Sequence, residues 1–583
     1  IYPEFGTGAV KVTAAHDPND FEMAVRHGVP MIIIMNEHGV MEGTGTKFDG
    51  MDRFDARRAV VEELRKDGLL GWEKRPYSHS VGHCSRCQTI VEPRLSLQWF
   101  VKVAPLAKAA GDAVRSGKVK ISPTEMEPRY FEWVDGMHDW CISRQLWWGH
   151  RIPVWYGPDG EVKVLGPDEV APAGWLQDED VLDTWFSSAL WPFSTLGWPD
   201  NTDDLKKFYP NSVLVTGYDI LFFWVARMMI FGLFAMDGKQ PFDTIVLHGL
   251  VRDKFGKKMS KSKGNVVDPL EFMDKYGSDA LRLGIIAKRS AGQNQAFSTA
   301  SVVAGRNFCN KLWNMARFIE PHINEQTGES PEPKTIADHW VIARLVAARE
   351  AVESHLEGYR FAEASDTVYH TVWNDVADWY LEASKLEPNP SVLAWVLETC
   401  LKLAHPFAPF VTEAIWTTLE RHTTPLISTS WPATTEFNEI ASSEFEQLRS
   451  LITEARFVAT ELPGGKQTLV YGADSLIADN EELVARLARL AAVRHTDQPK
   501  GLRLAVPNRE AWLEVTEEVL YEHQSKLETR LGETKARISS LRARLDNPRY
   551  VEQAPPAVVE ETRSQLEEQE ALIARLSKEL EVL

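Results

Sequence analysis

The sequence has few cysteines and no long apolar run. Five cysteines in 583 residues, an odd number scattered along the chain, exclude the disulfide framework of a small secreted protein, and we expect a cytoplasmic protein. The longest apolar run, 220–236, is shorter than the ~20 residues of a membrane span. Because Arg227 also lies in its middle, we predict a buried helix there and no membrane partner.

The sequence also lacks an excess of basic residues. Its 64 Lys and Arg against 83 Asp and Glu give a net charge of −19, so any contact with nucleic acid must depend on local basic patches. With 44% apolar and 25% charged residues, the composition is that of a globular protein of roughly three to five domains. The chain opens at Ile1 in a sequence typical of a domain interior, and we expect further sequence upstream.

A basic segment stands out in this acidic chain. Between Val251 and Lys263 the only acid is Asp253, and the basic residues are Arg252, Lys254, Lys257, Lys258, Lys261 and Lys263. A solvated charge run would not need Gly, Met and Ser at set places. A loop with lysines and hydroxyls can instead close on a triphosphate and neutralise charge as pyrophosphate leaves.

Strands and helices alternate on either side of this loop. Apolar residues at 212–220 and 244–250 predict two strands, and 221–234 predicts an apolar helix between them. This alternation indicates a doubly wound parallel sheet, which binds ligands beyond the carboxyl ends of its strands. Asp219 and His248 are expected at that edge.

The segment AHDPND at 15–20 lies between an expected strand and an expected helix, and MIIIM at 31–35 predicts a buried strand. Asp17 and Asp20 are consistent with a turn and a helix cap. They could instead gather with Lys11 and His16 around a polar ligand, with the carboxylates holding an amine or a water.

Two further clusters each allow two interpretations. Cys84 and Cys87 form a Cys-x-x-Cys turn after His83, which suits half of a structural zinc site, although a pair of reduced thiols fits equally well. The many tryptophans between residues 121 and 200 predict a core, because each ring buries a large apolar area. Alternatively, some wall a small apolar pocket, for which Trp185 beside Asp183 is the best candidate.

The C-terminal half is predicted to be mainly helical. Long amphipathic patterns between 300 and 430 indicate a bundle whose first helix carries a polar face that could bind RNA or the sheet domain, formed by Arg306, Asn307, Asn310, Lys311 and Asn314. From about Thr516, leucines spaced by three, four and seven predict an antiparallel coiled-coil hairpin. Its first arm is basic and could pair with the acidic second arm or grip phosphates.

These motifs together resemble one family. KMSKS at 258–262 is the second signature of class I aminoacyl-tRNA synthetases, and it stands in that family's order between Asp219 and RNFCNKLWN at 306–314. The chain closely resembles the C-terminal two thirds of bacterial valyl-tRNA synthetases. Isoleucyl enzymes are similar around 138–153, but TGYDILFFW at 216–224 and the C-terminal hairpin favour the valyl type.

The resemblance implies a function and a fold. It implies ATP-dependent activation of valine with Mg²⁺, transfer to tRNA(Val), and hydrolytic editing of threonyl-tRNA(Val), because an apolar pocket cannot strongly exclude threonine. The expected fold is part of a Rossmann-like α/β catalytic domain, a helical anticodon-binding bundle and a coiled coil, in a monomer. The expected regions are the end of an editing domain at 1–75, the catalytic domain at 76–300, the bundle at 301–440, a small mixed region at 441–515 and a tRNA-binding arm at 516–583.

The resemblance also assigns residues to roles. The catalytic residues would be Lys258, Lys261 and Ser262, and the ATP site would add His248, Gly249, Met259 and Ser260. Valine would be held by Trp185, Asp219 and Ile220, and editing would use Lys11, Asp17 and Asp20. Cys84 and Cys87 would hold zinc together with two further ligands. The tRNA would contact Arg306, Asn310, Lys311, Lys535, Arg537, Arg542 and Arg544.

One feature of the family is missing from this sequence. The first signature of the class, a His-x-Gly-His that contacts ATP, does not occur, and we expect the chain to be inactive without it. Three other functions compete with the valyl assignment: an isoleucyl-type synthetase, a non-catalytic tRNA-binding protein, and a lone editing hydrolase. Retention of KMSKS, Asp219 and Trp185 together argues against a protein that only binds RNA.

Overall fold

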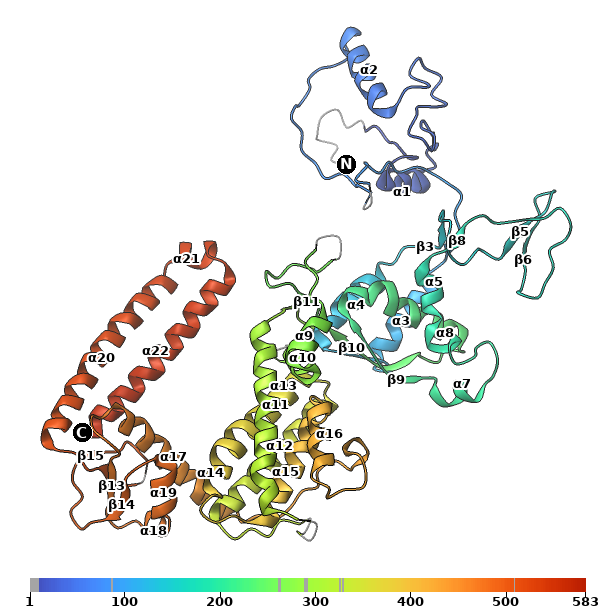
Figure 1. The fold of residues 1–583 in the computed structure, drawn as a ribbon. Coiled ribbons are helices and arrows are strands. Elements are labelled where there is room, and N and C mark those ends of the chain that lie inside the picture. Colours follow the sequence, from blue (N-terminus) through green and yellow to red (C-terminus); the bar gives the residue numbers. More distant parts are fainter. Residues whose placement is uncertain are drawn as a thin grey trace. The chain divides into compact units, whose positions relative to one another are not determined.

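The computed structural model describes residues 10–84, 87–260, 264–287, 292–324, 327, 330–507 and 509–582. Figure 1 shows the course of the chain. Two compact units are formed, and the chain passes repeatedly between them. The first unit comprises Ile1–Asp112, Glu132–Tyr209 and Phe223–Pro241, and the second comprises Ala113–Phe131, Pro210–Phe222 and Phe242–Leu583.

The first two helices begin at aspartate caps. Asp17 accepts hydrogen bonds from the backbone N–H groups of Asn19 and Asp20, which starts α1, Pro18–His27. Asp52 accepts one from Phe54 and starts α2, Arg53–Lys66. The helix expected after residues 15–20 is confirmed as α1, and the sequence pattern of residues 55–68, which also predicts a helix, corresponds to α2.

The expected buried strand at 31–35 is wrong. Only Met35 makes a bridge, to Met41, while Ile32 and Ile33 are 66% and 43% exposed. A strand requires hydrogen bonds from a neighbouring backbone along its length, and this segment has one such neighbour at a single position. Its apolar residues therefore favour a strand, but no neighbouring strand pairs with this segment along its length.

Short strands and helices fill the rest of the first unit. Three small antiparallel sheets are made by β1 with β3, β4 with β8, and β5 with β6 and β7. Their bounds are β1 Phe100–Val101, β3 Trp140–Cys141, β4 Ser143–Arg144, β5 Val154–Tyr156, β6 Val162–Val164, β7 Leu176–Gln177 and β8 Val181–Leu182. The helices are α5 Thr184–Ala189, α6 Trp191–Ser194, α7 Asp203–Phe208 and α8 Ala226–Ala235, while α3 Ala104–Arg115 and α4 Glu127–Asp135 each cross the division between units.

The tryptophans expected in the core are divided between interior and surface. Trp140 is buried, whereas the side chains of Trp147 and Trp148 are almost fully exposed in this structure. The expectation of a tryptophan core is therefore wrong for this pair. Composition predicts that aromatic rings will be covered, but it does not predict which part of the molecule covers them.

The longest apolar helical segment is Tyr218–Ala235. It is long and apolar enough to cross a membrane, and 44% of it is buried within the structure. The part from Leu221 to Val225 is π-helical and continues into α8, in which even Arg227 is buried. The expected buried helix is confirmed for α8, because most of its residues are buried. A helix of a protein core can be as long and as apolar as a membrane span.

A parallel sheet of three strands lies in the second unit. Its order is β2-β10-β9, with β2 Lys120–Ser122, β9 Asn211–Gly217 and β10 Phe242–His248. In register, His248 lies opposite Gly217. The two strands expected from the sequence are therefore confirmed as parallel neighbours, and their carboxyl ends meet at one edge. Next come β11 Val251–Arg252, α9 Pro269–Tyr276, α10 Ser278–Ile286 and β12 Gln295–Ala296.

A helical bundle follows in the second unit (Figure 1). It consists of α11 Thr299–Ile319, α12 Ile336–Glu357, α13 Phe361–His370 continuing through a π-helical segment Thr371–Tyr380 into α14 Leu381–Ala383, α15 Pro390–Ala404, α16 Pro409–Thr418 and α17 Glu439–Glu461. The sequence predicts one helix over 392–419, and this is wrong. The helix stops at Ala404, and Pro409, which has no N–H to donate, begins the next.

Polar side chains fix the bundle from inside. Asp338 is buried and completes a capping box with Thr335 at the start of α12. Its carboxylate also accepts hydrogen bonds from the Tyr380 hydroxyl at 2.8 Å and the Asn389 amide at 2.9 Å. One buried carboxylate thus joins three segments of the bundle, and all its bonds are satisfied in the way that buried charge requires.

The chain ends in a small sheet domain and a long helical hairpin. Four strands pair in the order β14-β13-β16-β15, with β13 Thr468–Tyr471, β14 Ala492–His495, β15 Leu502–Arg503 and β16 Ala511–Leu513, beside α18 Ser475–Ala478 and α19 Glu481–Ala488. The hairpin consists of α20 Glu517–Leu545, α21 Pro548–Gln553 and α22 Pro556–Val582. Figure 1 shows α20 and α22 side by side, as their contacts also require.

Candidate functional site

The functional edge of the parallel sheet carries Asp219 and His248. A side chain added at Gly217 would stand 2.7 Å from the Asp219 carboxylate and 3.7 Å from the His248 ring. Both residues therefore gather at the carboxyl end of β9, as the sequence predicts. Only glycine leaves the Asp219 carboxylate room in this position, which explains a small residue at the end of the strand.

Close backbone packing continues just after β10. A side chain at Gly249 would collide with the backbone of Gln293, and the Leu250 N–H donates to the Asn294 side chain at 2.8 Å. The Asn294 amide in turn donates to the Tyr218 hydroxyl at 2.7 Å. Asn294 thus connects the segment after β10 to the segment after β9 by hydrogen bonds.

Asp253 organises the base of the lysine loop. Its buried carboxylate accepts hydrogen bonds from the N–H groups of Phe255 and Lys257, and from the Asn265 amide at 2.8 Å. Asn265 also accepts from the Ser260 N–H at 2.9 Å and donates to the Lys258 carbonyl. These hydrogen bonds fix the backbone from Asp253 to Ser260, and the bond between Asp253 and Asn265 joins the segments before and after the loop.

The same hydrogen bonds keep Asp253 ionised. The bond from Asn265, and then the N–H of Lys257, lower the pKa of this carboxyl from 3.8. Because the pKa is depressed in the fold, the stabilising contribution is complete above 3.8 and is lost only as the pH falls through the lowered value. The base of the loop is therefore held throughout the neutral range.

The loop lysine Lys258 reaches Asp219. Its ammonium lies 3.2 Å from the Asp219 carboxylate, although the lysine side chain is 68% exposed and the pair is therefore weak. The predicted phosphate-binding group and the predicted amine-binding group thus meet at one edge. Lys261 and Ser262, the other two predicted catalytic residues, lie outside the described residues.

The three residues predicted to bind the amino acid belong to different units. Asp219 and Ile220 lie in the second unit and Trp185 in the first, where its ring stacks on Phe223 with centroids 6.0 Å apart. The grouping of these residues around one ligand stays a prediction.

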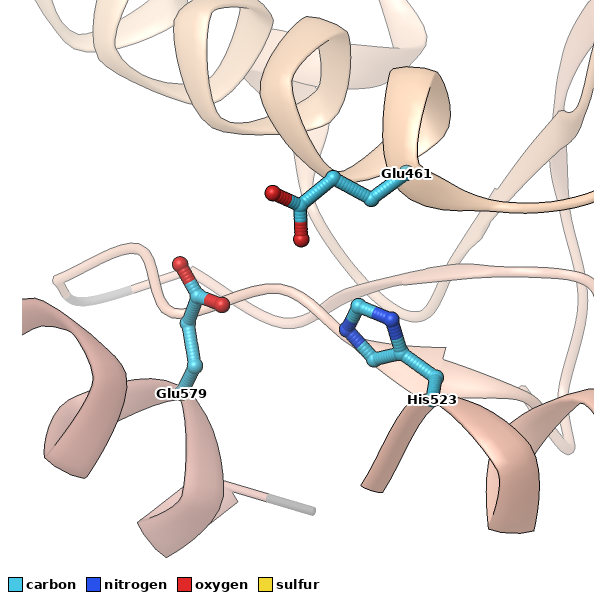
Figure 2. Close-up of side chains that lie close together, drawn as sticks. All are labelled: Glu461, His523 and Glu579. Carbon is cyan, nitrogen blue, oxygen red and sulfur yellow. The ribbon is translucent and has the colours of Figure 1, made fainter. Parts of the chain in front are cut away.

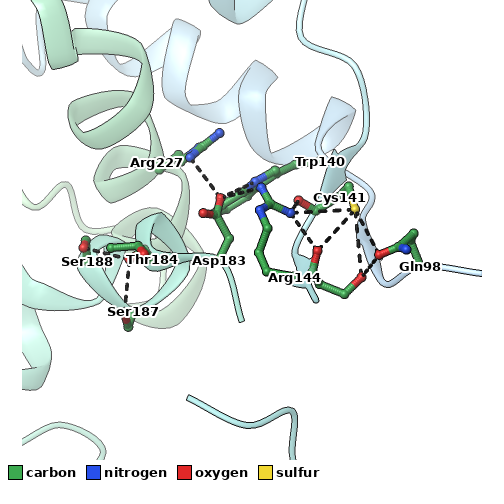
Figure 3. Close-up of polar contacts among 10 residues, drawn as sticks. Gln98, Trp140, Cys141, Arg144, Asp183, Thr184, Ser187, Ser188 and Arg227 are labelled. Carbon is green, nitrogen blue, oxygen red and sulfur yellow. Dashed lines mark hydrogen bonds and ion pairs between the residues drawn. The ribbon is translucent and has the colours of Figure 1, made fainter. Parts of the chain in front are cut away.

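A buried ion cluster supports the helix that carries Trp185. Asp183 precedes α5, and its Oδ2 atom accepts a hydrogen bond from the Trp140 indole at 3.1 Å. The same oxygen lies 3.2 Å from Arg144 and 3.5 Å from Arg227, whose guanidinium also packs over the Trp140 ring (Figure 3). The Asp183 carboxylate therefore pairs with the buried Arg227 and with the half-exposed Arg144, and it compensates the buried guanidinium, for which lack of a partner would be costly.

The predicted editing residues lie around the start of α1. Asp17 is the cap of that helix, which confirms the structural interpretation of this residue. Asp20 accepts from the N–H of Thr13 at 2.6 Å and from its hydroxyl at 3.0 Å, and Lys11 reaches the same hydroxyl at 3.4 Å. The backbone bond from Thr13 chiefly lowers the pKa of Asp20, so an anionic carboxylate is available for an amine.

The cysteine pair forms a tight turn. The Cys84 N–H donates to the Thr89 carbonyl at 2.8 Å, and a hydrogen bond between the Cys87 thiol and the Thr89 hydroxyl chiefly lowers the pKa of Cys87 to about 7. These thiols suit zinc, but a closed site needs four ligands. Within the described part of the chain, no third His, Cys, Asp or Glu side chain stands close enough to both sulfurs to complete it.

The predicted tRNA-binding residues differ in their surroundings. On α11, Arg306 and Asn310 are exposed, whereas Lys311 forms an ion pair with Asp378 at 2.7 Å. On α20, Arg542 pairs with Glu570 of the opposite arm at 2.6 Å, which agrees with pairing between the arms at this position. Three exposed basic residues of that helix make no ion pair with any described residue: Lys535, Arg537 and Arg544.

Sequence reasoning missed the residues that hold the site in place. Asp253 is the one acid among six basic residues, and that isolation was the available signal. Asn265 and Asn294 carried no signal, because an amide that bonds a loop backbone is indistinguishable in sequence from one in solvent.

Three families match successive parts of the chain. The family described as "tRNA synthetases class I (I, L, M and V)" matches residues 19–171 and 171–298. The "Anticodon-binding domain of tRNA ligase" matches 338–463, and the "Valyl tRNA synthetase tRNA binding arm" matches 520–583. The matched segments cover the sheet edge, the lysine loop, the helical bundle and the hairpin.

Relatives of similar sequence are known by name. A "Valine--tRNA ligase" of Streptomyces coelicolor is 51% identical over 610 residues, covering 100% of this chain and 68% of the relative. One from Mycobacterium tuberculosis is 48% identical, covering 97% of this chain and 67% of the relative.

Solved structures are more distant. A leucyl-tRNA synthetase of Agrobacterium radiobacter, in a ternary complex with tRNA and LeuAMS, is 18% identical with a TM-score of 0.45, covering 58% of this chain and 45% of its own. Mycobacterium tuberculosis methionyl-tRNA synthetase, solved with methionyl-adenylate, is 19% identical with a TM-score of 0.46, covering 61% of this chain and 71% of its own.

Proposed function

The chain belongs to the valine–tRNA ligase family of class I aminoacyl-tRNA synthetases, and on that premise we propose how its residues carry out valine activation, editing and tRNA binding. Its function is the ATP-dependent joining of valine to tRNA. The observation that carries this conclusion is the 51% identity that extends over the whole chain, through the catalytic, anticodon-binding and arm segments in their expected order. The same identity and order of segments argue against the alternative functions of a lone editing hydrolase and an isoleucyl-type synthetase.

Valine activation is proposed to occur at the edge of the parallel sheet. Asp219 holds the ammonium group of valine, and Trp185 and Ile220 line the side-chain pocket. His248 and Gly249 border the nucleotide, and the loop from Lys258 to Ser262 binds the phosphates of ATP, which enters with Mg²⁺. The valine carboxylate then attacks the α-phosphorus and pyrophosphate leaves. Positioning and neutralisation of charge contribute most to such a step.

The ion pair between Lys258 and Asp219 supports this assignment. An ammonium group already rests on the Asp219 carboxylate at 3.2 Å, so the carboxylate is placed to accept another one. When valine binds, its ammonium takes over Asp219 and Lys258 becomes free to bind phosphate. The exchange costs little because the pair is exposed to solvent.

Replacing Asp219 with alanine tests the proposed valine site. We expect the KM for valine to rise about 10- to 100-fold, because a hydrogen bond to a charged group is lost at the ammonium. Valine-dependent ATP–pyrophosphate exchange measures the KM, in an enzyme that also carries the His-x-Gly-His signature. Asp274→Ala, which removes an exposed acid from α9, is the matched control and should leave KM unchanged. An unchanged valine KM in the Asp219 variant would refute the assignment.

Editing is proposed to use Asp20, supported by Asp17 and Lys11. The Asp20 carboxylate is ionised and lies beside a lysine and a threonine, a setting that can receive the amine of a mischarged aminoacyl group. Hydrolysis is needed because the activation pocket distinguishes valine poorly from threonine, its near isostere. Asp17 acts through the helix, by fixing where α1 begins.

Replacing Asp20 with alanine should slow deacylation of threonyl-tRNA(Val) by about tenfold or more, because the charged contact to the amine is lost. Release of labelled threonine from mischarged tRNA measures the rate. Thr13→Ala removes the hydroxyl bond to Asp20 and keeps the carboxylate, and this variant should deacylate nearly as fast as the parent. Equal losses in the two variants would mean that Asp20 only stabilises the turn.

The tRNA is proposed to contact two exposed basic surfaces. One is the α11 face with Arg306, Asn310 and Lys311, and the other is the basic helix α20 with Lys535, Arg537, Arg542 and Arg544. Local groups of basic residues on an acidic protein provide the charge that phosphate binding requires.

The finer points of architecture are proposed in the same way. We infer a doubly wound catalytic sheet at 76–300, an editing segment at 1–75, the anticodon-binding bundle at 301–440, a mixed region at 441–515 and a coiled-coil arm at 516–583. The enzyme acts in the cytoplasm as a monomer. A zinc ion at Cys84 and Cys87 requires two further ligands.

A further inference from the structure

Three potential metal ligands meet at the base of the C-terminal hairpin. Glu461 is the last residue of α17, His523 lies in the second turn of α20, and Glu579 lies near the end of α22. One donor atom from each residue lies within 4.8 Å of the other two. Figure 2 shows the imidazole and both carboxylates pointing toward a common space between the three helices.

Two of the three residues are buried, and one of their carboxylate oxygens has no hydrogen-bond partner among the described residues. The His523 and Glu579 residues are each 5% exposed. The Oε2 atom of Glu579 is buried and has no hydrogen-bond partner among the described residues. Since a buried carboxylate oxygen is normally bonded, the structure has a position for one more positively charged partner.

The nearby arginines do not fill that position. Arg575 bonds the Oε1 atom of Glu579 at 3.1 Å and also lies 3.4 Å from Glu454. Arg530 bonds the Oε1 atom of Glu461 at 2.7 Å. Each of these arginines therefore bonds one oxygen of its acid. Oε2 of Glu579 remains for a further partner.

The ligand set has a recognisable chemistry. One imidazole nitrogen with carboxylate oxygens suits zinc and similar divalent transition metals, with water completing the coordination. The imidazole of His523 is buried, and a histidine binds a metal through its neutral ring. Neighbouring ligands of a tetrahedral zinc ion stand about 3.3 Å apart, so rotations that close the gaps by up to ~1.5 Å would complete the geometry.

We propose that Glu461, His523 and Glu579 form a binding site for a divalent transition metal such as zinc, which fastens the base of the hairpin to the end of α17. The ion would join three helices that are distant in sequence, in addition to the apolar contacts and ion pairs that hold them here. Its role is structural, because the site contains no group that the activation or editing reaction uses.

Cobalt binding to the full chain tests the proposal. The chain carries Cys84→Ser and Cys87→Ser so that the thiol pair cannot bind the ion, and it is freed of metal with a chelator. Titration with Co²⁺, followed by visible absorption and by calorimetry, should give one bound ion per chain. Glu579→Gln and His523→Gln should each weaken binding by more than about 100-fold, because each removes a direct ligand.

Two exposed acids on the same helices provide matched controls. Glu522→Gln is next to His523 and Glu581→Gln is two residues from Glu579, and both should bind Co²⁺ like the parent. Circular dichroism checks that each variant is folded. If Glu579→Gln or His523→Gln does not fold, Glu461→Gln replaces it, because Glu461 is more exposed.

The thermal transition supplies an independent readout. Zn²⁺ should raise the midpoint of unfolding in the cysteine-free parent and in both controls, and should leave it unchanged in the ligand variants. The proposal is overturned if the parent binds no Co²⁺ at millimolar concentration. It is equally overturned if the ligand variants bind Co²⁺ as tightly as the parent.

Discussion

In an enzyme that also carries the His-x-Gly-His signature, replacing Lys261 with alanine is expected to lower the rate of valine-dependent ATP–pyrophosphate exchange by about 10²–10³-fold, with a much smaller change in valine affinity. In the proposed mechanism this lysine neutralises charge that grows on the phosphates as pyrophosphate leaves. That charge is greatest in the transition state, so the loss should appear in kcat. Initial rates over a range of valine and ATP concentrations separate the two parameters.

The lysine loop supplies its own control. Lys254→Ala removes an exposed ammonium that packs on the Phe255 ring, and exchange should stay within about twofold of the parent because surface substitutions of this kind have small effects. If Lys261→Ala reduced valine affinity as much as kcat, Lys261 would act on binding in general and not chiefly on the phosphates.

Replacing Asp183 with alanine should destabilise the first unit by about 3–5 kcal/mol, because the buried Arg227 would lose its carboxylate partner. Arg227 is only 8% exposed, and its Nε atom already has no partner among the described residues. Thermal unfolding followed by tryptophan fluorescence, together with resistance to limited proteolysis, measures the loss. Asp183→Asn, which keeps an acceptor for Trp140, should lose less.

A double variant separates lost charge balance from lost packing. Arg227→Met combined with Asp183→Ala removes both charges and retains an apolar side chain over the Trp140 ring, so part of the lost stability should return. If the double variant were as unstable as the sum of the single ones, the Arg227 and Asp183 charges would not be coupled. An Asp183→Ala variant with parental stability would exclude a supporting role for the ion cluster.

The sequence predicts this protein best where one local pattern decides the structure. Most helices of the bundle follow from apolar spacing, α1 follows from an aspartate cap, and β9 and β10 follow from apolar runs on either side of a helix. Asp219 and His248 were placed correctly at one edge, because the carboxyl ends of parallel strands meet there.

The predictions from sequence are wrong where the structure of a segment depends on contacts with other parts of the chain. The segment 31–35 has the composition of a buried strand, yet its isoleucines are exposed, because pairing along its length is absent here. Trp147 and Trp148 resemble core residues in composition and lie on the surface. Neither outcome is encoded in the residues themselves, and both depend on what lies beside them.

The hidden parts of the candidate sites share another property. Asn265 and Asn294 act through side-chain hydrogen bonds that join segments apart in the sequence. Glu461, His523 and Glu579 meet only after three helices have packed. No spacing rule links such residues, because a metal site or loop anchor assembled across a fold has no fixed period. Motifs locate the reacting groups, whereas the residues that position those groups come from tertiary structure.

The contact between Lys258 and Asp219 makes the two substrates of the first reaction interdependent. ATP that draws Lys258 away leaves Asp219 open for valine, and valine that occupies Asp219 releases Lys258 for ATP. The two ligands should therefore bind with positive cooperativity, equal in both directions because the coupling is a single free energy. An exposed pair contributes at most about 1 kcal/mol, which limits the mutual gain in affinity to roughly fivefold and makes it sensitive to salt.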